Sequence, residues 1–325
     1  MTQTASAPAI SLSQLTKRFG NVEALRGVDF VVEQGQIYGF LGPNGAGKTT
    51  TIGVLTGFIK ADAGAAQVLG HDAWRSSVEI KRHLGFLPDT ISFGRGLTGE
   101  AFLGHIARLH GISGTPPLQR ELLDRLELAG AALKRNVKGY STGMAKKLAL
   151  VQAMQHAPEL LIMDEPTESL DPLIRQVMFA LFHELQQRGT TIFMSSHVLA
   201  DVEEVCERVA LIRDGVIVKT GAVDDLRVGQ VRTMLVTLRD PEAAMAVTGA
   251  HVVEREGASV RLAVDGDIND VIRSLADHDL ADIVYERTSL EELFLSYYRG
   301  DEDDGVTPPL GDAPNPHAEP RAADD

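Results

Sequence analysis

One stretch of the sequence decides the fold: Gly42-Pro43-Asn44-Gly45-Ala46-Gly47-Lys48-Thr49-Thr50. It has the spacing G-x-x-x-x-G-K-T, the apolar run at 37–41 before it predicts a buried strand, and residues 49–56 after it predict a helix. Glycines there let backbone N–H groups turn inward around a polyphosphate, where Lys48 can reach the outer phosphates and the Thr49 hydroxyl can bind Mg²⁺. Glycine-rich turns without a ligand are common between strands and helices, but the lysine–threonine pair and both flanks favour a phosphate-binding loop.

The composition is that of a folded protein. Its 325 residues allow about two domains, and its hydrophobic fraction is 44%. The net charge of −14 argues against broad nucleic-acid binding and against a polybasic attachment to anionic lipid, because both need clustered Lys and Arg. No apolar run approaches the roughly twenty residues that span a bilayer, and the N-terminus lacks the pattern of a signal peptide, so we expect any membrane role to depend on a partner. Cys206, the single cysteine, excludes an internal disulfide and is predicted to be a buried, small apolar residue.

Residues 10–32 alternate apolar and polar side chains in short bursts around Phe19-Gly20-Asn21, which predicts a hairpin-rich β layer ahead of the phosphate-binding loop. Phe19 could stack on a nucleotide base or be a half-buried strand residue, and the residues alone favour the second interpretation. Farther along, residues 84–87 predict a short strand that a proline turn ends, and the carboxylate of Asp89 lies just beyond it.

Residues 97–156 are predicted to be mainly helical. Amphipathic segments at 101–110 and 118–128 are separated by a break at 113–117. A third helix is predicted to begin at Tyr140-Ser141-Thr142-Gly143, because Ser141 is a good N-cap, and to end before a proline at 158.

Two acids end the next apolar run, at 159–166. The run is too short for most helices and predicts a central parallel strand, whose Asp164 and Glu165 project at its C-terminal end, where open α/β sheets place their ligands. Two adjacent acids in such a place commonly form only a solvated turn. Near a phosphate-binding loop, however, the first can hold Mg²⁺ through its ligand shell and the second can orient or deprotonate an attacking water, and we favour this interpretation.

His197 follows a further predicted strand. A helix at 173–187 leads to a strand at 190–194, which delivers Ser195-Ser196-His197 to the same sheet edge. A lone histidine is usually a surface or packing residue, but an imidazole at this edge can contact a γ-phosphate. A helix at 200–208 and a hairpin turning at Asp214-Gly215 come next.

From about residue 222 the pattern restarts. It predicts strands at 233–238, 252–254, 260–264 and 283–285 and helices at 241–247 and 268–280, an order that could make a small split-βαβ domain. A last helix is predicted to open with the capping box Ser289-Leu290-Glu291-Glu292. Residues 301–325, rich in Pro, Gly, Ala and Asp, are predicted to be a disordered acidic tail.

Over residues 10–221, these features together resemble the nucleotide-binding subunit of an ATP-binding-cassette transporter. The segment Tyr140-Ser141-Thr142-Gly143-Met144 resembles the family's signature loop, Ser169-Leu170-Asp171-Pro172 its D-loop, and His197 its switch histidine. The resemblance implies an α/β fold, a P-loop NTPase core with an antiparallel β layer and a helical subdomain at about 90–156. The expected organisation is a flexible N-terminus at 1–9, the cassette at 10–221, a C-terminal α+β, ferredoxin-like accessory domain at 222–300 and the tail at 301–325.

The resemblance also implies ATP and Mg²⁺ as cofactors and two cassettes that sandwich two ATP molecules, each between one subunit's phosphate-binding loop and the other's signature loop. Carried over position by position, the catalytic residues are Glu165 as general base and His197, and the metal residues are Thr49 and Asp164. The nucleotide-binding residues are Phe19 as base-stacking aromatic, Gly42, Pro43, Asn44, Gly45, Ala46, Gly47, Lys48, Thr49, Thr50, Asp89, Ser141, Thr142, Gly143 and Asp171.

Three positions depart from the family's usual pattern. Thr142 replaces the second glycine of the signature loop, Met144 replaces its glutamine, and Asp89 stands where a glutamine commonly touches Mg²⁺ and the attacking water. Asp89 and Met144 are similar to the subgroup whose ATPase subunits pair with separate six-helix membrane subunits, often drug or polyketide exporters. The C-terminal segment ending in Leu293-Phe294 resembles that subgroup's extension.

The function implied is an ATP-hydrolysing subunit that energises export of a drug, antibiotic or lipid-like substrate. We expect a second cassette subunit, in a homodimer, and transmembrane permease subunits coupled through residues 89–97, with the chain peripheral at the cytoplasmic face of the membrane. No nucleic-acid partner and no membrane span of its own are expected. Two alternatives stay open: a non-transport cassette ATPase that acts on ribosomes or nucleic acid, and the ATPase of an importer.

Overall fold

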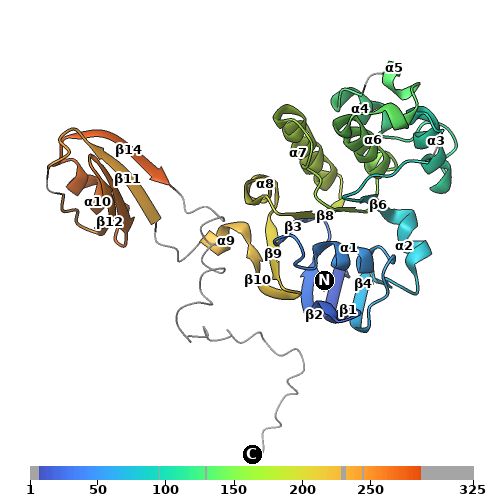
Figure 1. Ribbon diagram of the computed structural model, residues 1–325, viewed down its shortest axis with the longest axis horizontal. Helices are drawn as coiled ribbons and strands as arrows, with labels where there is room; N and C mark the ends of the chain where they lie inside the picture. Colours follow the sequence, from blue (N-terminus) through green and yellow to red (C-terminus); the bar gives the residue numbers. More distant parts are fainter. Residues whose placement is uncertain (1–6, 95, 129, 228–231, 244, 287–325) are drawn as a thin grey trace, which may run out of the picture.

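The computed structural model describes residues 7–94, 96–128, 130–227, 232–243 and 245–286. Its centre is a six-stranded sheet in the order β10-β9-β3-β8-β7-β6 (Figure 1). All neighbours pair in parallel except β10, which returns antiparallel to β9. The strands are β3 (Ile37–Leu41), β6 (Leu84–Leu87), β7 (Leu160–Met163), β8 (Thr191–Ser196), β9 (Arg208–Arg213) and β10 (Val216–Ala222).

Strands β3, β7 and β8 are buried at every position, which explains their continuous apolar sequences. The predicted parallel strands are confirmed, with two differences at their ends. Strand β7 ends at Met163, just before the two acids, and β8 extends through Ser195 and Ser196, which were expected to follow it. Both serines are fully buried, so their hydroxyls need partners inside the protein.

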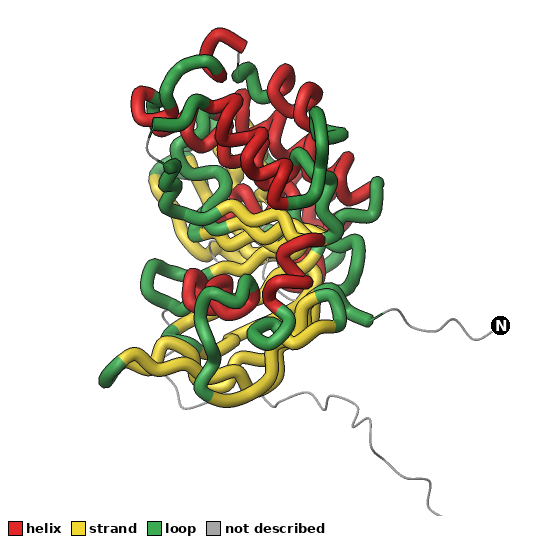
Figure 2. Tube along the Cα trace, turned by 90° about the vertical axis from the view of Figure 1, so that its right-hand side faces the viewer, coloured by secondary structure: helices red, strands yellow, loops and turns green. Residues whose placement is uncertain are grey.

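Two layers cover this sheet (Figures 1 and 2). One face carries helices α3 (Gly99–Leu109), α4 (Gln119–Arg125), α6 (Thr142–Met154) and α7 (Pro172–Gln187). On the other side, α1 (Lys48–Leu55) lies between the central sheet and a second sheet in the order β2-β1-β4-β5 (Figure 1). That sheet consists of β1 (Ile10–Phe19), β2 (Val22–Val32), β4 (Ala63–Val68) and β5 (His71–Asp72). The predicted α/β fold class, with its β layer and helical part, is confirmed.

Aromatic side chains connect the central sheet to the second sheet. Phe30 of β2 stacks on Tyr38 and Phe193 of the central sheet, with ring centroids 5.9 and 5.8 Å apart. Smaller elements complete the part around the central sheet: α2 (Ser77–His83), α5 (Gly130–Leu133), a 3₁₀ turn (Val137–Gly139), α8 (Leu199–Val205) and α9 (Val223–Arg227).

Side-chain caps fix where three helices begin. Thr98, Ser141 and Asp171 precede α3, α6 and α7, and each accepts a hydrogen bond from a backbone N–H in the first turn. The predicted start of α6 is thus confirmed. The predicted segment at 118–128 is shorter than expected, because α4 ends at Arg125.

The C-terminal residues form a separate antiparallel sheet in the order β12-β13-β11-β14. Its elements are β11 (Arg232–Leu238), β12 (Ala250–Glu256), β13 (Ser259–Val264), α10 (Ile268–Leu275) and β14 (Leu280–Glu286), with their own buried core. The strand order is that of the split-βαβ arrangement predicted from the sequence. The segments predicted at 289–292 and 301–325 lie outside the described residues.

The helix predicted at 241–247 is wrong. The described part of that segment is a turn, in which the Asp240 side chain accepts from the Glu242 N–H at 3.0 Å and the Asp240 carbonyl accepts from the Ala243 N–H at 3.2 Å. An Asx turn competes directly with helix initiation, and so short a helix cannot offset the cost of its first turn. The second predicted helix also ends early, at Leu275.

Cys206 is buried, as predicted, and burial raises the pKa of its thiol, which keeps it protonated and unreactive. Among the helices that the structure describes, none combines the length and apolar character needed to cross a bilayer.

A buried histidine makes the stability of the fold depend on pH. His156 stacks on His110 at a centroid distance of 3.8 Å, and burial lowers its pKa from 6.5 to about 4, with help from the neighbouring His110. The unfolded chain therefore takes up a proton at this residue first as the pH falls. Stability is lost between pH 6.5 and about 4, by at most about 3 kcal/mol. We expect His156→Gln to flatten this dependence in urea unfolding curves, and the exposed control His71→Gln to leave it unchanged.

Candidate nucleotide-binding and catalytic site

The glycine-rich loop connects β3 to α1, and its backbone requires glycine. Gly47, the residue before α1, has φ 111°, and a Cβ there would lie 2.7 Å from the Ala24 carbonyl oxygen. A Cβ on Gly42 would lie 2.4 Å from the carbonyl oxygen of Ile212. The loop is therefore pressed against β2 and β9, and its N–H groups gather at the start of α1.

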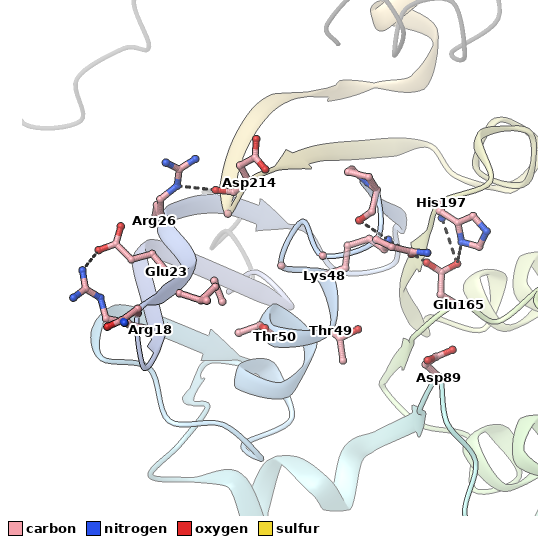
Figure 3. A pocket seen from close by; sticks show the side chains of 18 of the residues that line it. Arg18, Glu23, Arg26, Lys48, Thr49, Thr50, Asp89, Glu165, His197 and Asp214 are labelled. Carbon is pink, nitrogen blue, oxygen red and sulfur yellow. Dashed lines mark hydrogen bonds and ion pairs between the residues drawn. The ribbon is translucent and has the colours of Figure 1, made fainter.

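A cavity of about 1040 Å³ opens beside this loop (Figure 3). Loop residues line it together with residues of five other chain segments: 18–26, Asp89, 165–168, His197 and 214–215. Of the residues predicted from the sequence, it brings together Pro43, Asn44, Gly45, Gly47, Lys48, Thr49, Thr50, Asp89, Glu165 and His197. Gly42, Ala46 and Asp164 lie behind this lining.

Lys48 and His197 hold the carboxylate of Glu165 from two sides (Figure 3). The Lys48 Nζ lies 3.2 Å from Glu165 Oε1 and also donates to the carbonyl of Gly42 at 2.6 Å. On the other side, Glu165 Oε2 lies 2.9 Å from His197 Nδ1 and accepts from the His197 N–H at 3.3 Å. Glu165 is 7% exposed, so these contacts replace most of its solvation.

Asp164 lies deeper and meets the Thr49 hydroxyl. Its carboxylate is 2% exposed, and burial raises its pKa, an effect opposed by hydrogen bonds from Ser195 and Thr49 and reinforced by the negative charges of Asp89 and Glu165. The Ser195 hydroxyl donates to Asp164 Oδ1 at 2.5 Å. A buried carboxylate with such neighbours gains from a cation.

Sequence reasoning missed the part played by Ser195. Its hydroxyl also accepts from the backbone N–H of Glu165 at 3.1 Å, so one side chain of β8 holds both acids at the end of β7. The sequence placed Ser195 at the right sheet edge, but nothing in it distinguished this serine from Ser196.

The signature-like and D-loop-like residues lie apart from this cavity. Ser141 is the N-cap of α6, accepting from the Met144 N–H at 3.2 Å, and Asp171 is the N-cap of α7, accepting from the Ile174 N–H at 3.1 Å. Neither they nor Thr142 and Gly143 line the cavity of their own chain. A Cβ on Gly143 would lie 3.5 Å from the Ser169 carbonyl, so the two loops adjoin.

Phe19 is not brought to the cavity. It is 49% exposed, and the Lys17 Nζ lies 5.3 Å from its ring centroid, so its base-stacking role stays a prediction. The end of the cavity away from α1 is instead lined by charged side chains that the sequence did not single out. They are Arg18, which pairs with Glu23, and Arg26, whose Nε donates to the Asp214 carbonyl at 2.7 Å.

Comparisons with known proteins agree with this geometry. The ABC transporter family model matches residues 25–168. The bacitracin transport ATP-binding protein BcrA of Bacillus licheniformis is 35% identical over 74% of this chain and 79% of its own length. The daunorubicin/doxorubicin resistance ATP-binding protein DrrA of Streptomyces peucetius is 31% identical over 92% of this chain and 95% of its own.

A solved structure described as the ATP-binding subunit of an ABC transporter superposes with a TM-score of 0.63 and 29% identity, over 67% of this chain and 92% of that one. Both relatives are aligned over most of their length, and the family match includes the loop at Gly42–Thr50 and both acids of β7. The chain therefore belongs to the ATP-binding subunits of ABC transporters, a family of ATPases.

Proposed function

We propose that this chain hydrolyses MgATP in the cavity beside α1 and uses the cycle to drive export of a drug- or antibiotic-like compound through separate membrane subunits. The observation that carries the catalytic part is the carboxylate of Glu165, held between Lys48 and His197 at the edge of the cavity. The relatives that transport bacitracin and confer daunorubicin resistance support the transport part.

The donor set at Thr49 and Asp164 fits a magnesium ion. A hydroxyl and a carboxylate are the oxygen ligands that Mg²⁺ prefers, and the two side chains lie within hydrogen-bonding reach of each other. The buried negative charge of Asp164 favours the binding of a cation at this site. When bound, the ion neutralises charge on the phosphates during transfer.

The protein's own residues supply the remaining functions. The backbone N–H groups at the start of α1 bind phosphate oxygens, and the ammonium of Lys48, already in the loop, can turn from Glu165 to the outer phosphates. Glu165 then accepts the proton of the attacking water, and His197 keeps the carboxylate oriented.

We propose further that the working form is a homodimer with composite sites. Ser141, Thr142 and Gly143 lie at the start of α6, where backbone N–H groups have no partner within the helix, yet they do not line the cavity of their own chain. A second copy placed head to tail would present these donors to the phosphates bound by the first. Each site is then completed by the partner, and ATP holds the pair together.

The proposed contact with the membrane subunits is an apolar groove beside β6. The sequence placed this contact at residues 89–97. We extend it to the apolar groove, defined here as the cavity of about 560 Å³ lined by Phe58, Val78 and Leu109, which are 63%, 72% and 68% exposed. Three large apolar side chains exposed together mark an interaction surface. With this contact, the chain lies at the cytoplasmic face of the membrane.

Leu109→Glu is expected to weaken the contact with the membrane subunits. A carboxylate in the apolar groove should reduce the amount of membrane subunit that co-purifies from detergent extracts at least about tenfold, because buried hot-spot contacts dominate such interfaces. ATP turnover of the isolated Leu109→Glu subunit should stay within about twofold of the turnover of the unsubstituted chain. Val253→Glu, on a 58% exposed position of β12, is the matched control and should co-purify normally.

The function as a whole is tested by identifying what the chain binds in its cells of origin. We expect a polytopic membrane protein in the detergent extract, and deletion of the gene should increase sensitivity to an antibiotic. A ribosome or DNA in the extract would instead support the non-transport alternative. Loss of uptake of a nutrient on deletion would support the importer.

A further inference from the structure

A buried lysine of α6 contacts the main chain of the proposed general base. Lys146 is 3% exposed, and its Nζ donates to the carbonyl oxygen of Glu165 at 2.7 Å. Lys146 lies just over one helical turn beyond Ser141, the cap of the same helix. One rigid helix therefore begins with the signature loop and contacts the catalytic strand of its own chain.

The backbone of Glu165 needs such support. Its φ is 49°, in the left-handed region, which costs a non-glycine residue about 1 kcal/mol or more. Two bonds fix the flanking peptides: the Glu165 N–H donates to Ser195 Oγ at 3.1 Å, and the Glu165 carbonyl accepts from Lys146. This conformation directs the Glu165 side chain between Lys48 and His197. The hydrogen bond from Lys146 to the Glu165 carbonyl therefore helps to fix the position of the carboxylate.

Lys146 is also a cation among acids. Burial lowers the pKa of its ammonium, while the carboxylates of Asp89, Glu168, Asp164 and Glu165 act in the opposite direction, Asp89 most strongly. Asp89 lines the cavity, at the position where the family commonly has a neutral glutamine. The chain therefore has an additional negative charge near its phosphate site and a buried positive charge that acts on it.

We propose that Lys146 is a positioning residue for ATP hydrolysis, which holds the main chain of Glu165 in its left-handed conformation through the bond to its carbonyl oxygen. Lys146 does not line the cavity, so it acts through Glu165 rather than on the nucleotide. The proposal rests on the role proposed above for Glu165.

The test compares three variants by steady-state kinetics and by calorimetric binding of ATP. Lys146→Met keeps the length of the side chain and removes its charge and its donors. We expect kcat to fall about ten- to a hundredfold, while KM and the ATP dissociation constant change less than about twofold, as for an interaction that matters only in the transition state. Lys146→Arg, which retains the charge and donors, should recover part of kcat.

The double variant Lys146→Met with Asp89→Asn guards against misfolding of the single variant, because it removes one charge of each sign and leaves the net charge unchanged. If Lys146→Met does not fold alone, the double variant is compared with Asp89→Asn. The kcat of the double variant must then be lower than that of Asp89→Asn, with KM unchanged. Equal kcat values for these two variants would overturn the positioning role.

Two further outcomes separate this proposal from the proposed function. A rise in KM with unchanged kcat in Lys146→Met would mean that the lysine supports nucleotide binding, not positioning. If Glu165→Gln turns over ATP normally, the base assignment fails, and the role of Lys146 fails with it. If Glu165→Gln is inactive but Lys146→Met is as active as the original chain, only the positioning role is wrong.

Discussion

Glu165→Gln is expected to lower ATP turnover by at least about a hundredfold, the usual effect of losing a general base. The amide keeps the size of the side chain and can still meet His197, which lies 2.9 Å away, but it cannot accept a proton from water. ATP binding should persist, because the glycine-rich loop, Lys48 and Thr49 are unchanged. Single-turnover hydrolysis and calorimetric ATP binding measure the two quantities separately.

The same variant should trap the nucleotide-bound pair. Since hydrolysis releases the dimer in the proposed cycle, Glu165→Gln should accumulate as a dimer with ATP and remain monomeric with ADP, as measured by size-exclusion chromatography with light scattering. Glu168→Gln is the matched control, because Glu168 also lines the cavity but makes no contact with His197 in the described structure. Unchanged turnover in Glu165→Gln would move the base role elsewhere, and Asp89 would be the next carboxylate to test.

The features predicted correctly from the sequence are those whose geometry is fixed by neighbours in the chain. A strand, a glycine turn and a helix fix the phosphate-binding loop, and a short apolar run ending in Asp164 and Glu165 fixes the acidic strand end. Local hydrogen bonds likewise fix the caps at Ser141 and Asp171. Each of these depends on residues a few positions apart, so the pattern is visible without the fold.

The residues that were missed are brought to the site by the order of the strands. Ser195 reaches both acids because β8 pairs with β7, and Arg26 reaches Asp214 because the turn after β9 packs against β2. In the sequence, Lys146 has the pattern of a charged residue on a solvent-exposed helix face. Its burial becomes visible only when α6 packs against the sheet. The incorrect prediction of a helix at 241–247 has a local cause instead. A single Asx turn at Asp240 outweighed the helix propensity of the alanines that follow it.

Mixing two inactive variants is expected to restore ATP hydrolysis. Lys48→Met removes the ammonium that faces the phosphates, and Gly143→Asp places a carboxylate in the first turn of α6, where the partner's phosphates are proposed to bind. Each variant alone should hydrolyse ATP at least about a hundredfold more slowly than the original chain. Gly143→Asp should fold normally, because an acid is favoured in the first turn of a helix and its Cβ would meet only the Ser169 carbonyl, at 3.5 Å.

Composite sites predict the amount of activity that returns. In a mixed dimer one site contains both lesions, and the other contains an intact phosphate-binding loop and an intact signature loop from different chains. Random pairing therefore gives up to roughly a quarter of the original turnover if the sites act independently. If each site lay within one chain, every site would carry a lesion and mixing would restore nothing. Gly143→Asn, which adds similar bulk without charge, should retain more turnover than Gly143→Asp, because the expected damage is repulsion between the carboxylate and the partner's phosphates.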